Sequence, residues 1–296
     1  MSDVIGICAL CDQEKALLES HIIPKFVFRW MKRTGGTGYL RGTKNIDVRL
    51  QDGFKKRLLC TECELLLNGW ETQFANKFFN LAVEDGWPNG TYTSWLSKFC
   101  ASVVWRAALH MESEALLDDL SEDARKDLVG ALSTWKAFIL AGRTNPGKNE
   151  LHLIAVGEFS QLRRQHLPPN WHRYTQRTTE MDYSFNDSGT FSAIHVKMGP
   201  VSVFGHIKNS TQRWVGTRVA VNHGNFRFDA TLPTSLIDYY IMRAERSREK
   251  LSNMSTKQKG VVARTILDNT DRLRTSDFLK VMEQDVNLFG RDAFND

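Results

Sequence analysis

The sequence lacks several features that would place it in a special class. No stretch approaches the roughly 18 consecutive apolar residues of a membrane-spanning helix, and no internal repeat or low-complexity tract is present. Residues 1–6 have neither the basic start nor the apolar stretch of a signal peptide. We therefore expect a globular, cytoplasmic protein that does not bind membranes.

Cysteine is scarce, and its distribution is informative. The chain of 296 residues has five cysteines, and four of them form two Cys-x-x-Cys pairs, Cys8 with Cys11 and Cys60 with Cys63. Each pair lets one tight turn supply two thiolates, so the four residues predict a structural, tetrahedral Zn²⁺ site. A redox pair is the alternative, but the βαβ pattern of a thioredoxin-like site is absent. The fifth cysteine, Cys100, is expected to be a buried small hydrophobic residue.

The overall composition is that of an ordinary globular protein. Hydrophobic residues make up 42% and charged residues 25% of the chain. The net charge of +5 permits contact with nucleic acid but does not by itself argue for it. Four basic clusters are candidates for phosphate contact: Lys55-Lys56-Arg57, Arg29 with Lys32-Arg33, Arg163-Arg164, and Arg243, Arg246, Arg248 and Lys250.

The spacing of apolar residues predicts an α+β fold in two parts. Residues 1–82 form a compact zinc-bound unit, and residues 92–296 form a helical segment, an antiparallel sheet and C-terminal helices. The sheet packs on the preceding helices as one body or forms a separate domain; we favour one body. Helices are predicted after Cys63 (with Leu66, Trp70, Phe74 and Phe78 as an apolar stripe), from Ser94 to Met111, from Ser121 to Gly142, and over 234–247, 257–268 and 276–287. Strands are predicted over 153–156, 192–196, 201–207, 214–221 and 225–228, with a hairpin turn at Gly199-Pro200.

His21 lies on the segment between the two cysteine pairs. A neutral imidazole can take a proton from water near pH 7, so His21 is a candidate general base; alternatively, it caps a turn or satisfies a core hydrogen bond. A phosphodiester hydrolase also needs a divalent ion to stabilise the charge that develops on phosphate. Nearby candidates to bind that ion are Glu19, Asp52, Glu64, Asn68 and Glu71.

The motif order over residues 5–75 resembles the zinc-bearing HNH, or His-Me finger, endonucleases. It runs Cys-x-x-Cys, Ser-His-Ile-Ile-Pro and Leu-Leu-Cys-x-x-Cys-Glu. The resemblance implies a ββα, treble-clef unit in which His21 is the general base and Pro24 is the proline that follows it. It also implies a structural zinc on the four cysteines and a catalytic Mg²⁺ or Mn²⁺. The implied substrate is nucleic acid, with DNA favoured over RNA, and the implied setting is prokaryotic defence.

Three positions depart from the family's pattern. Ser20 replaces the acid before the histidine, Lys55 replaces an asparagine, and Glu64 replaces the asparagine or histidine after the last cysteine. Because glutamate binds Mg²⁺ well, Glu64 is expected to act as the catalytic metal ligand. Two hypotheses follow: a metal-dependent endonuclease, or an inactive zinc-binding module that acts as a nucleic-acid- or protein-binding sensor or adaptor. A protein partner or homo-oligomer is open under both.

The remaining histidines and aromatic residues predict little chemistry. His195 and His206 are placed to face each other across the hairpin, which alone does not make a second metal site. Core packing is expected for three tryptophans, Trp70, Trp95 and Trp135. The segment 171–174, after two prolines, is the best exposed candidate for stacking on nucleic acid, with a packed loop as the alternative.

Overall fold

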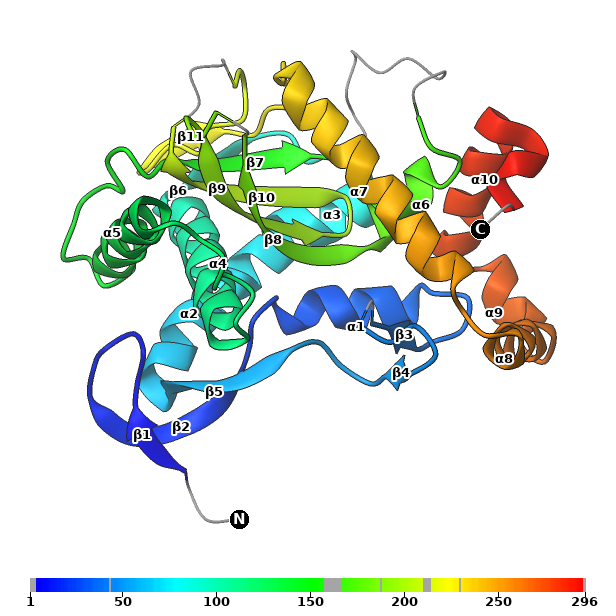
Figure 1. Cartoon of the computed structure of the whole chain (residues 1–296), viewed down its shortest axis with the longest axis horizontal. Helices are drawn as coiled ribbons and strands as arrows, with labels where there is room; N and C mark the ends of the chain where they lie inside the picture. The colour runs from blue at the N-terminus through cyan, green and yellow to red at the C-terminus, as the bar shows by residue number, and fades with distance from the viewer. Residues whose placement is uncertain are drawn as a thin grey trace.

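The chain is seen in a computed structural model that describes residues 4–42, 44–156, 167–186, 188–209, 214–228 and 230–294. It is a mixed α/β structure in which helices surround antiparallel sheets (Figure 1). No helix within the described residues is long and apolar enough to cross a membrane. The basic pair Arg163-Arg164 lies outside the described residues.

The N-terminal part is a three-stranded antiparallel sheet with helices beside it. Strand β2 lies in the middle, between β1 and β5, and α2 begins directly after β5 with Cys60 as its N-cap residue. This confirms the predicted helix start at the second cysteine pair. In chain order, the elements are β1 (Ile5–Ile7), β2 (Glu14–His21), α1 (Lys25–Arg33), β3 (Leu40–Arg41), β4 (Arg49–Leu50), β5 (Lys55–Cys60), α2 (Thr61–Phe74), the π-helical turn η1 (Ala75–Phe79) and α3 (Asn80–Glu84).

The apolar stripe predicted on the helix after Cys63 is partly wrong. Leu66 is 39% exposed, and Leu67 takes its place in the core. Phe74 and Phe78 are both buried as expected, and their rings stack at 5.0 Å. The π-helical turn η1 follows Phe74 and changes the angular spacing, so a strict spacing of four residues does not describe the buried face.

The second part is a four-stranded antiparallel sheet between two layers of helices. Helices α4 and α5 pack on one face, and Tyr239 and Tyr240 of α7 contact His195 on the other. The elements are β6 (Thr91–Thr93), α4 (Ser94–Ser113), α5 (Glu122–Ile139), β7 (Leu151–Ala155), α6 (Trp171–Arg177), β8 (Thr179–Phe185), β9 (Ser192–Met198), β10 (Val201–Lys208), β11 (His223–Asn225), α7 (Thr234–Ser252), α8 (Thr256–Leu267), α9 (Thr270–Arg274), α10 (Asp277–Phe289) and the 3-10 helix η3 (Gly290–Phe294).

The hairpin β9–β10 is the centre of this sheet, whose strand order is β7-β10-β9-β8. Its predicted turn at Gly199-Pro200 is confirmed, and Gly199 has a φ of 60°, which favours glycine. Gly205 of β10 allows a close helix approach, because an added Cβ would lie 2.6 Å from Trp135 of α5. The hairpin is thus enclosed on both faces.

The hairpin register corrects one prediction about its histidines. His195 pairs with Phe204, and His206 pairs with Ala193, because the tight turn sets Met198 against Val201. The two histidines are therefore not opposite each other. They share one face of the sheet, since positions 204 and 206 of a strand point the same way.

Two predicted strands near the end of the sheet are wrong. Residues 214–221 make isolated bridges at Val215 and Arg218 rather than a strand, since Gly216 has a φ of 77° and interrupts the extended backbone. The predicted strand 225–228 lies instead over β11 (His223–Asn225), which pairs with β6. Strand β8, at the edge of the main sheet, was not predicted from the sequence.

The predicted helices of the second part are found, with small differences at their ends. Thr93, rather than Ser94, is the N-cap residue of α4. Ser121 caps α5 as predicted and accepts a hydrogen bond from the Ala124 backbone N–H at 3.3 Å. The left-handed residue after α5 is Ala141, with a φ of 61°, and not Gly142.

The tryptophans mostly lie where core packing predicts. Trp95 and Trp135 are buried, and Trp70 is partly buried against the core. The segment 171–174 is not an exposed stacking surface: it begins α6, and Trp171 and Tyr174 are each 1% exposed. Cys100 is fully buried in α4, as predicted.

The C-terminal helices return to the N-terminal part. Arg272 of α9 donates from Nε to the carbonyl of Gly35 at 2.9 Å and also donates to the carbonyl of Lys32. The backbone N–H of Phe278 donates to the Thr34 carbonyl at 3.3 Å. In Figure 1, α8 and α9 accordingly lie beside α1, β3 and β4. One buried apolar cluster also contains residues of both parts, from Cys8 to Val219.

A buried lysine in the hairpin makes stability depend on pH. Lys197 is fully buried, and its Nζ donates to the carbonyls of Thr175, Thr178 and Gly199 at 2.7–3.2 Å. These contacts favour the ammonium form, but burial outweighs them and lowers the pKa of Lys197 from 10.5 to about 7.

We expect Lys197→Met to weaken this dependence. Between pH 7 and pH 10.5 the unfolded chain binds a proton that the folded chain does not, so the free energy of unfolding rises with pH, by up to about 1.4 kcal/mol per unit. Lys197→Met removes this contribution. Above pH 10.5, where Lys197 is neutral in both the folded and the unfolded chain, the substitution destabilises the fold by about 2 kcal/mol because buried carbonyls lose their donor. Urea unfolding of both proteins at several pH values measures both effects; equal pH slopes would contradict the assignment.

Candidate metal centre and the His21 site

The four cysteines of the two Cys-x-x-Cys pairs come together in the N-terminal part. The Sγ atoms of Cys8, Cys11, Cys60 and Cys63 all lie within 4.8 Å of one another, and those of Cys11 and Cys60 are 3.8 Å apart. Three of the four residues are buried, and Cys11 is partly exposed. The cluster can therefore hold a structural metal ion such as Zn²⁺, which favours four thiolates in tetrahedral geometry.

Backbone structure explains how the cysteines meet. Cys8 and Cys11 lie in the turn between β1 and β2, which closes with Cys8 N–H donating to the Gln13 carbonyl at 2.9 Å. Asp12 there has a φ of 59°, a conformation that Asp tolerates better than most residues. Ala9 N–H donates to the Leu58 carbonyl at 3.0 Å and brings this turn against β5. In the second pair, Cys60 is the last residue of β5 and Cys63 lies in the first turn of α2.

The thiols differ in how readily they ionise. Burial raises the pKa of Cys8, but backbone N–H groups of Cys11 and Cys60 outweigh it and lower that pKa to about 7. The Cys60 N–H donates to Cys8 Sγ at 3.3 Å. Burial and the neighbouring cysteines raise the pKa of Cys63. Four thiolates this close repel one another unless a cation neutralises them, so the donor set suits a divalent metal.

His21 stands at the end of β2 and contacts a carboxylate. Its Nε2 lies 3.0 Å from Asp52 Oδ2. Asp52 also binds Lys55 Nζ at 2.9 Å and accepts from the Gly53 N–H at 2.9 Å. Burial raises the pKa of Asp52, but the hydrogen bonds from Lys55, His21 and Gly53 outweigh it and hold that pKa well below its usual range. Asp52 is therefore an acceptor, and His21 Nε2 carries the proton.

This tautomer leaves the second ring nitrogen of His21 available. With Nε2–H donating to Asp52, the lone pair lies on Nδ1, for which no partner is found among the described residues. The His21 side chain is 14% exposed and that of Asp52 is 26% exposed. The pair can thus accept a proton at Nδ1 while the carboxylate stabilises the resulting imidazolium.

The loop that carries Asp52 is fixed by its neighbours. Gly53 lies so close to the ring of Phe28 of α1 that a Cβ on Gly53 would be 2.0 Å from that ring. Lys32 of α1 donates to the Gln51 carbonyl at 2.7 Å. The Ile22 N–H donates to the Phe54 carbonyl at 3.0 Å and ties the loop to β2. These contacts explain how an aspartate 31 residues from His21 reaches it.

The other predicted metal ligands are not gathered around His21. Among the described residues, His21 and Glu64 belong to no group of three or more Cys, His, Asp or Glu ligand atoms within 4.8 Å. Glu64 lies in the first turn of α2, and its Oε1 is buried without a hydrogen-bond partner. Glu19 and Asn68 are exposed, and Glu71 is bound to Arg106 of α4 at 2.6 Å.

Arg106 is a positioning residue that the sequence did not single out. It is 1% exposed, and its guanidinium donates to the His21 carbonyl at 2.8 Å and to Glu71 Oε1. It therefore joins α4, α2 and the end of β2. A sequence signal exists in retrospect, since an arginine in an otherwise apolar helix is seldom buried without partners.

We expect Arg106→Met to destabilise the protein by about 3 kcal/mol. The substitution keeps much of the side-chain volume but leaves the carboxylate of Glu71, which is 14% exposed, without its counter-charge. Urea unfolding measures the change. Arg29→Met, at an exposed position on α1, is the matched control and should stay within about 0.5 kcal/mol of the native protein; an equally small effect of Arg106→Met would show that the ion pair stabilises little.

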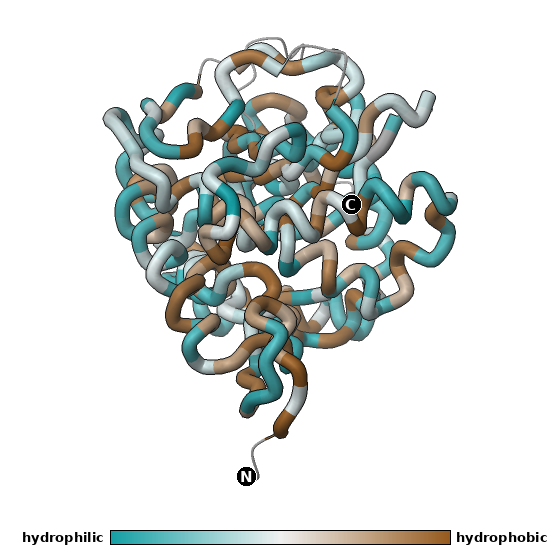
Figure 2. Tube along the Cα trace, turned by 90° about the vertical axis from the view of Figure 1, so that its left-hand side faces the viewer, coloured by the Kyte–Doolittle hydropathy of each residue, from teal (hydrophilic) through white to brown (hydrophobic). Residues whose placement is uncertain are grey.

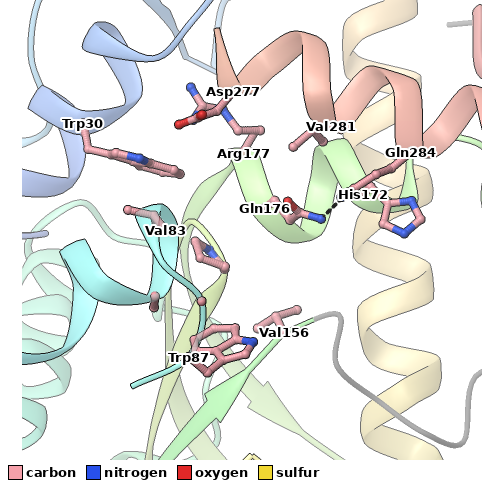
Figure 3. A pocket seen from close by; sticks show the side chains of 13 residues that line it. Trp30, Val83, Trp87, Val156, His172, Gln176, Arg177, Asp277, Val281 and Gln284 are labelled. Atoms are coloured by element: carbon pink, nitrogen blue, oxygen red, sulfur yellow. Dashed lines mark hydrogen bonds between the residues drawn. The ribbon is translucent and has the colours of Figure 1, made fainter. Parts of the chain in front are cut away.

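A separate cavity of about 490 Å³ lies between the two parts of the chain. In Figure 3, Arg177 of α6 and Asp277 of α10 lie near Trp30 of α1, and Trp87 lies at the far end of the lining. Arg177 stacks on Trp30 at 4.4 Å and donates to Thr34 Oγ1 at 2.7 Å. Trp30 Nε1 is buried without a hydrogen-bond partner. The cavity is thus lined by apolar, aromatic and charged groups, and Arg177 already contacts Trp30.

Comparison with known proteins finds no relative of this chain. No protein family matches the chain, and neither a curated protein nor a solved structure gives a match. The fold and the cysteine cluster therefore have to be interpreted from their own chemistry.

Proposed function

We propose that the chain is a metal-dependent endonuclease that hydrolyses phosphodiester bonds in nucleic acid, with His21 as general base. The observation that carries the proposal is the contact of His21 Nε2 with Asp52 at 3.0 Å. His21 is the last residue of strand β2, and the first residue of that strand follows the turn that carries Cys8 and Cys11. Strand β2 pairs with β5, and α2 follows β5. This arrangement supports the proposed ββα, treble-clef unit, with α1, β3 and β4 inserted between the two strands.

The proposed reaction uses His21 to activate water. Nδ1 takes the proton as the water oxygen attacks phosphorus, and the carboxylate of Asp52 stabilises the imidazolium that forms. The P–O bond to one sugar oxygen breaks, and that leaving oxygen takes a proton from solvent. When bound, Mg²⁺ or Mn²⁺ would stabilise the negative charge on the phosphate oxygens. Glu64 and Asp52 are the carboxylates we propose for that ion; Glu64 Oε1 is buried and unpartnered, which suits a ligand role.

Basic residues on β5 support nucleic acid as the substrate. Lys55 pairs with His21 across the two strands, and Arg57 pairs with Glu19. Lys55 and Arg57 are both exposed, so cations stand beside the His21–Asp52 pair where phosphate would approach. We propose DNA rather than RNA as substrate. We also propose a protein partner or a homo-oligomer, because Ile5 and Ile7 of edge strand β1 are 59% and 61% exposed.

One observation favours the second candidate, a zinc module without catalysis. Asp52 already neutralises Lys55 at 2.9 Å, and Glu64 is not grouped with His21 and Asp52 within 4.8 Å. A catalytic cation would have to displace Lys55 from the carboxylate. In that case the chain binds nucleic acid or protein through its basic surface as a sensor or adaptor and hydrolyses nothing.

A nuclease assay separates the two candidates. Purified wild-type protein and His21→Ala are incubated with plasmid DNA and with RNA, each with EDTA, Mg²⁺ or Mn²⁺. The endonuclease proposal expects metal-stimulated cleavage by the wild type alone. Salt-sensitive binding by both proteins with no cleavage under any condition would favour the zinc module. Equal cleavage by both proteins would exclude His21 as the base.

A further inference from the structure

A second group of metal-binding side chains lies at the end of strand β7, away from the cysteines. Glu150 precedes β7, His152 lies on β7, and His206 lies on the adjacent strand β10. The His206 N–H donates to the Glu150 carbonyl at 2.8 Å, and Phe204 pairs with His152. The three side chains therefore share one face of the sheet, and a ligand atom from each lies within 4.8 Å of the others.

Neighbouring residues orient two of the three groups. Nδ1 of His152 and Thr217 Oγ1 are hydrogen-bonded at 2.8 Å, which leaves Nε2 directed at Glu150 Oε2, 3.6 Å away. Arg218 binds the other carboxylate oxygen, Glu150 Oε1, at 3.1 Å. When a metal ion takes the lone pair on His152 Nε2, Nδ1–H donates to Thr217 Oγ1. Such outer contacts, which fix a tautomer and aim a ligand atom, are typical of metal sites.

The inner nitrogens lack partners. His152 and His206 are each 3% exposed, and the Nε2 atom of each is buried without a hydrogen-bond partner among the described residues. Buried polar atoms in folded proteins are nearly always satisfied. The nearest acceptor of His152 Nε2 is Glu150 Oε2, at the long distance of 3.6 Å, and the His206 side chain also interacts with Asn209. A metal ion between Glu150 and the two rings would satisfy the Nε2 atoms.

We propose that Glu150, His152 and His206 form a second metal site, which binds a divalent transition-metal ion such as Zn²⁺. Two imidazole nitrogens and one carboxylate oxygen suit ions of this class better than Mg²⁺ or Ca²⁺, which prefer oxygen ligands. Three protein ligands leave a coordination position for water or another small ligand. The site is independent of the cysteine cluster and of the His21 chemistry.

Metal binding requires a movement of one ring. The imidazoles of His152 and His206 are stacked, with centroids 4.2 Å apart and planes inclined by 22°. An imidazole binds a metal ion in its own plane, so two nearly parallel rings cannot both aim at one ion. Thr217 holds His152 in place, and His206 therefore turns about its Cβ–Cγ bond. The ring of Trp214 stands edge-on to His206 at 4.7 Å and 86°, and that of Phe191 at 5.2 Å and 84°, so both must adjust when His206 turns.

The test is cobalt binding to the full chain. Protein whose cysteine cluster is filled with zinc is titrated with Co²⁺, and bound metals are counted by mass spectrometry after dialysis. The proposal expects one further ion per chain, with weak visible bands and no sulfur-to-cobalt charge-transfer band. Glu150→Gln and His206→Gln should each weaken cobalt binding by roughly 100-fold or more, and Thr217→Val should weaken it by about 10- to 100-fold, the usual effect of an outer contact.

Controls keep the test decisive. His223→Gln, at an exposed histidine of β11, should bind cobalt as the wild type does. If His206→Gln fails to fold, Glu150→Gln still reports on the site, because the Glu150 side chain is 24% exposed and its replacement keeps its shape. Wild-type protein that binds no ion beyond the cysteine cluster would overturn the proposal. Cobalt binding that is equal in the wild type, Glu150→Gln and Thr217→Val would overturn it as well.

Discussion

Replacement of Cys60 by serine is expected to abolish zinc binding and to unfold the N-terminal part of the chain. Cys60 ends β5, caps α2 and lies 3.8 Å from Cys11 across the cluster. Structural zinc sites contribute about 10–16 kcal/mol of apparent binding free energy in small domains, which is comparable to the whole stability of a typical domain. Hydroxyl is a poor zinc ligand, so most of this contribution is lost.

Metal analysis and thermal unfolding measure the effect of Cys60→Ser. The wild type should hold one zinc ion per chain more than the variant, namely the ion on its four cysteines, and the variant should lose its cooperative transition. Cys100→Ser is the matched control, since Cys100 is buried in α4 outside the cluster and its variant should keep the zinc. A full complement of zinc in Cys60→Ser would show that the four cysteines do not form the site.

Under the endonuclease proposal, removal of the His21 side chain is expected to reduce phosphodiester cleavage by about 10²- to 10⁴-fold, the usual contribution of a general base. The fold should survive, because Asp52 keeps its contacts with Lys55 at 2.9 Å and with the Gly53 N–H. The backbone carbonyl of residue 21, which accepts from Arg106, is also unchanged by His21→Ala.

Initial cleavage rates of wild type and His21→Ala, at equal zinc content and equal thermal stability, measure this loss. His223→Ala is the control, since that exposed histidine lies on β11, outside the proposed site, and its variant should cleave at the wild-type rate. A folded, zinc-loaded His21→Ala protein with wild-type activity would assign the base to another residue.

Local chemistry in the sequence predicted the cysteine cluster and most helices. The spacing within each cysteine pair dictates a turn with two thiolates, and Cys60 and Cys63 could be placed at a helix start because an apolar helical pattern follows them. The capping hydroxyl of Ser121 likewise marks the start of α5. These features depend on residues that are neighbours in sequence, and they are found in the structure.

Features that depend on distant partners could not be predicted. The buried ion pair of Arg106 with Glu71 joins two helices 35 residues apart, and the irregular course of residues 214–221 follows from the conformation of Gly216. Asp52 was one of five candidate carboxylates and amides, and its contact with His21 depends on how Gly53 packs on Phe28. The roles of His21 and Glu64 in catalysis stay predictions.

The return of Arg272 to the carbonyls of Lys32 and Gly35 has a consequence for synthesis on the ribosome. These partners are more than 230 residues apart, at separations of 240 and 237. At about 5–20 residues per second, α1 emerges at least ten seconds or so before α9 exists. The N-terminal part must therefore stand without its C-terminal contacts during translation, and a metal ion on the four cysteines would hold it in that interval.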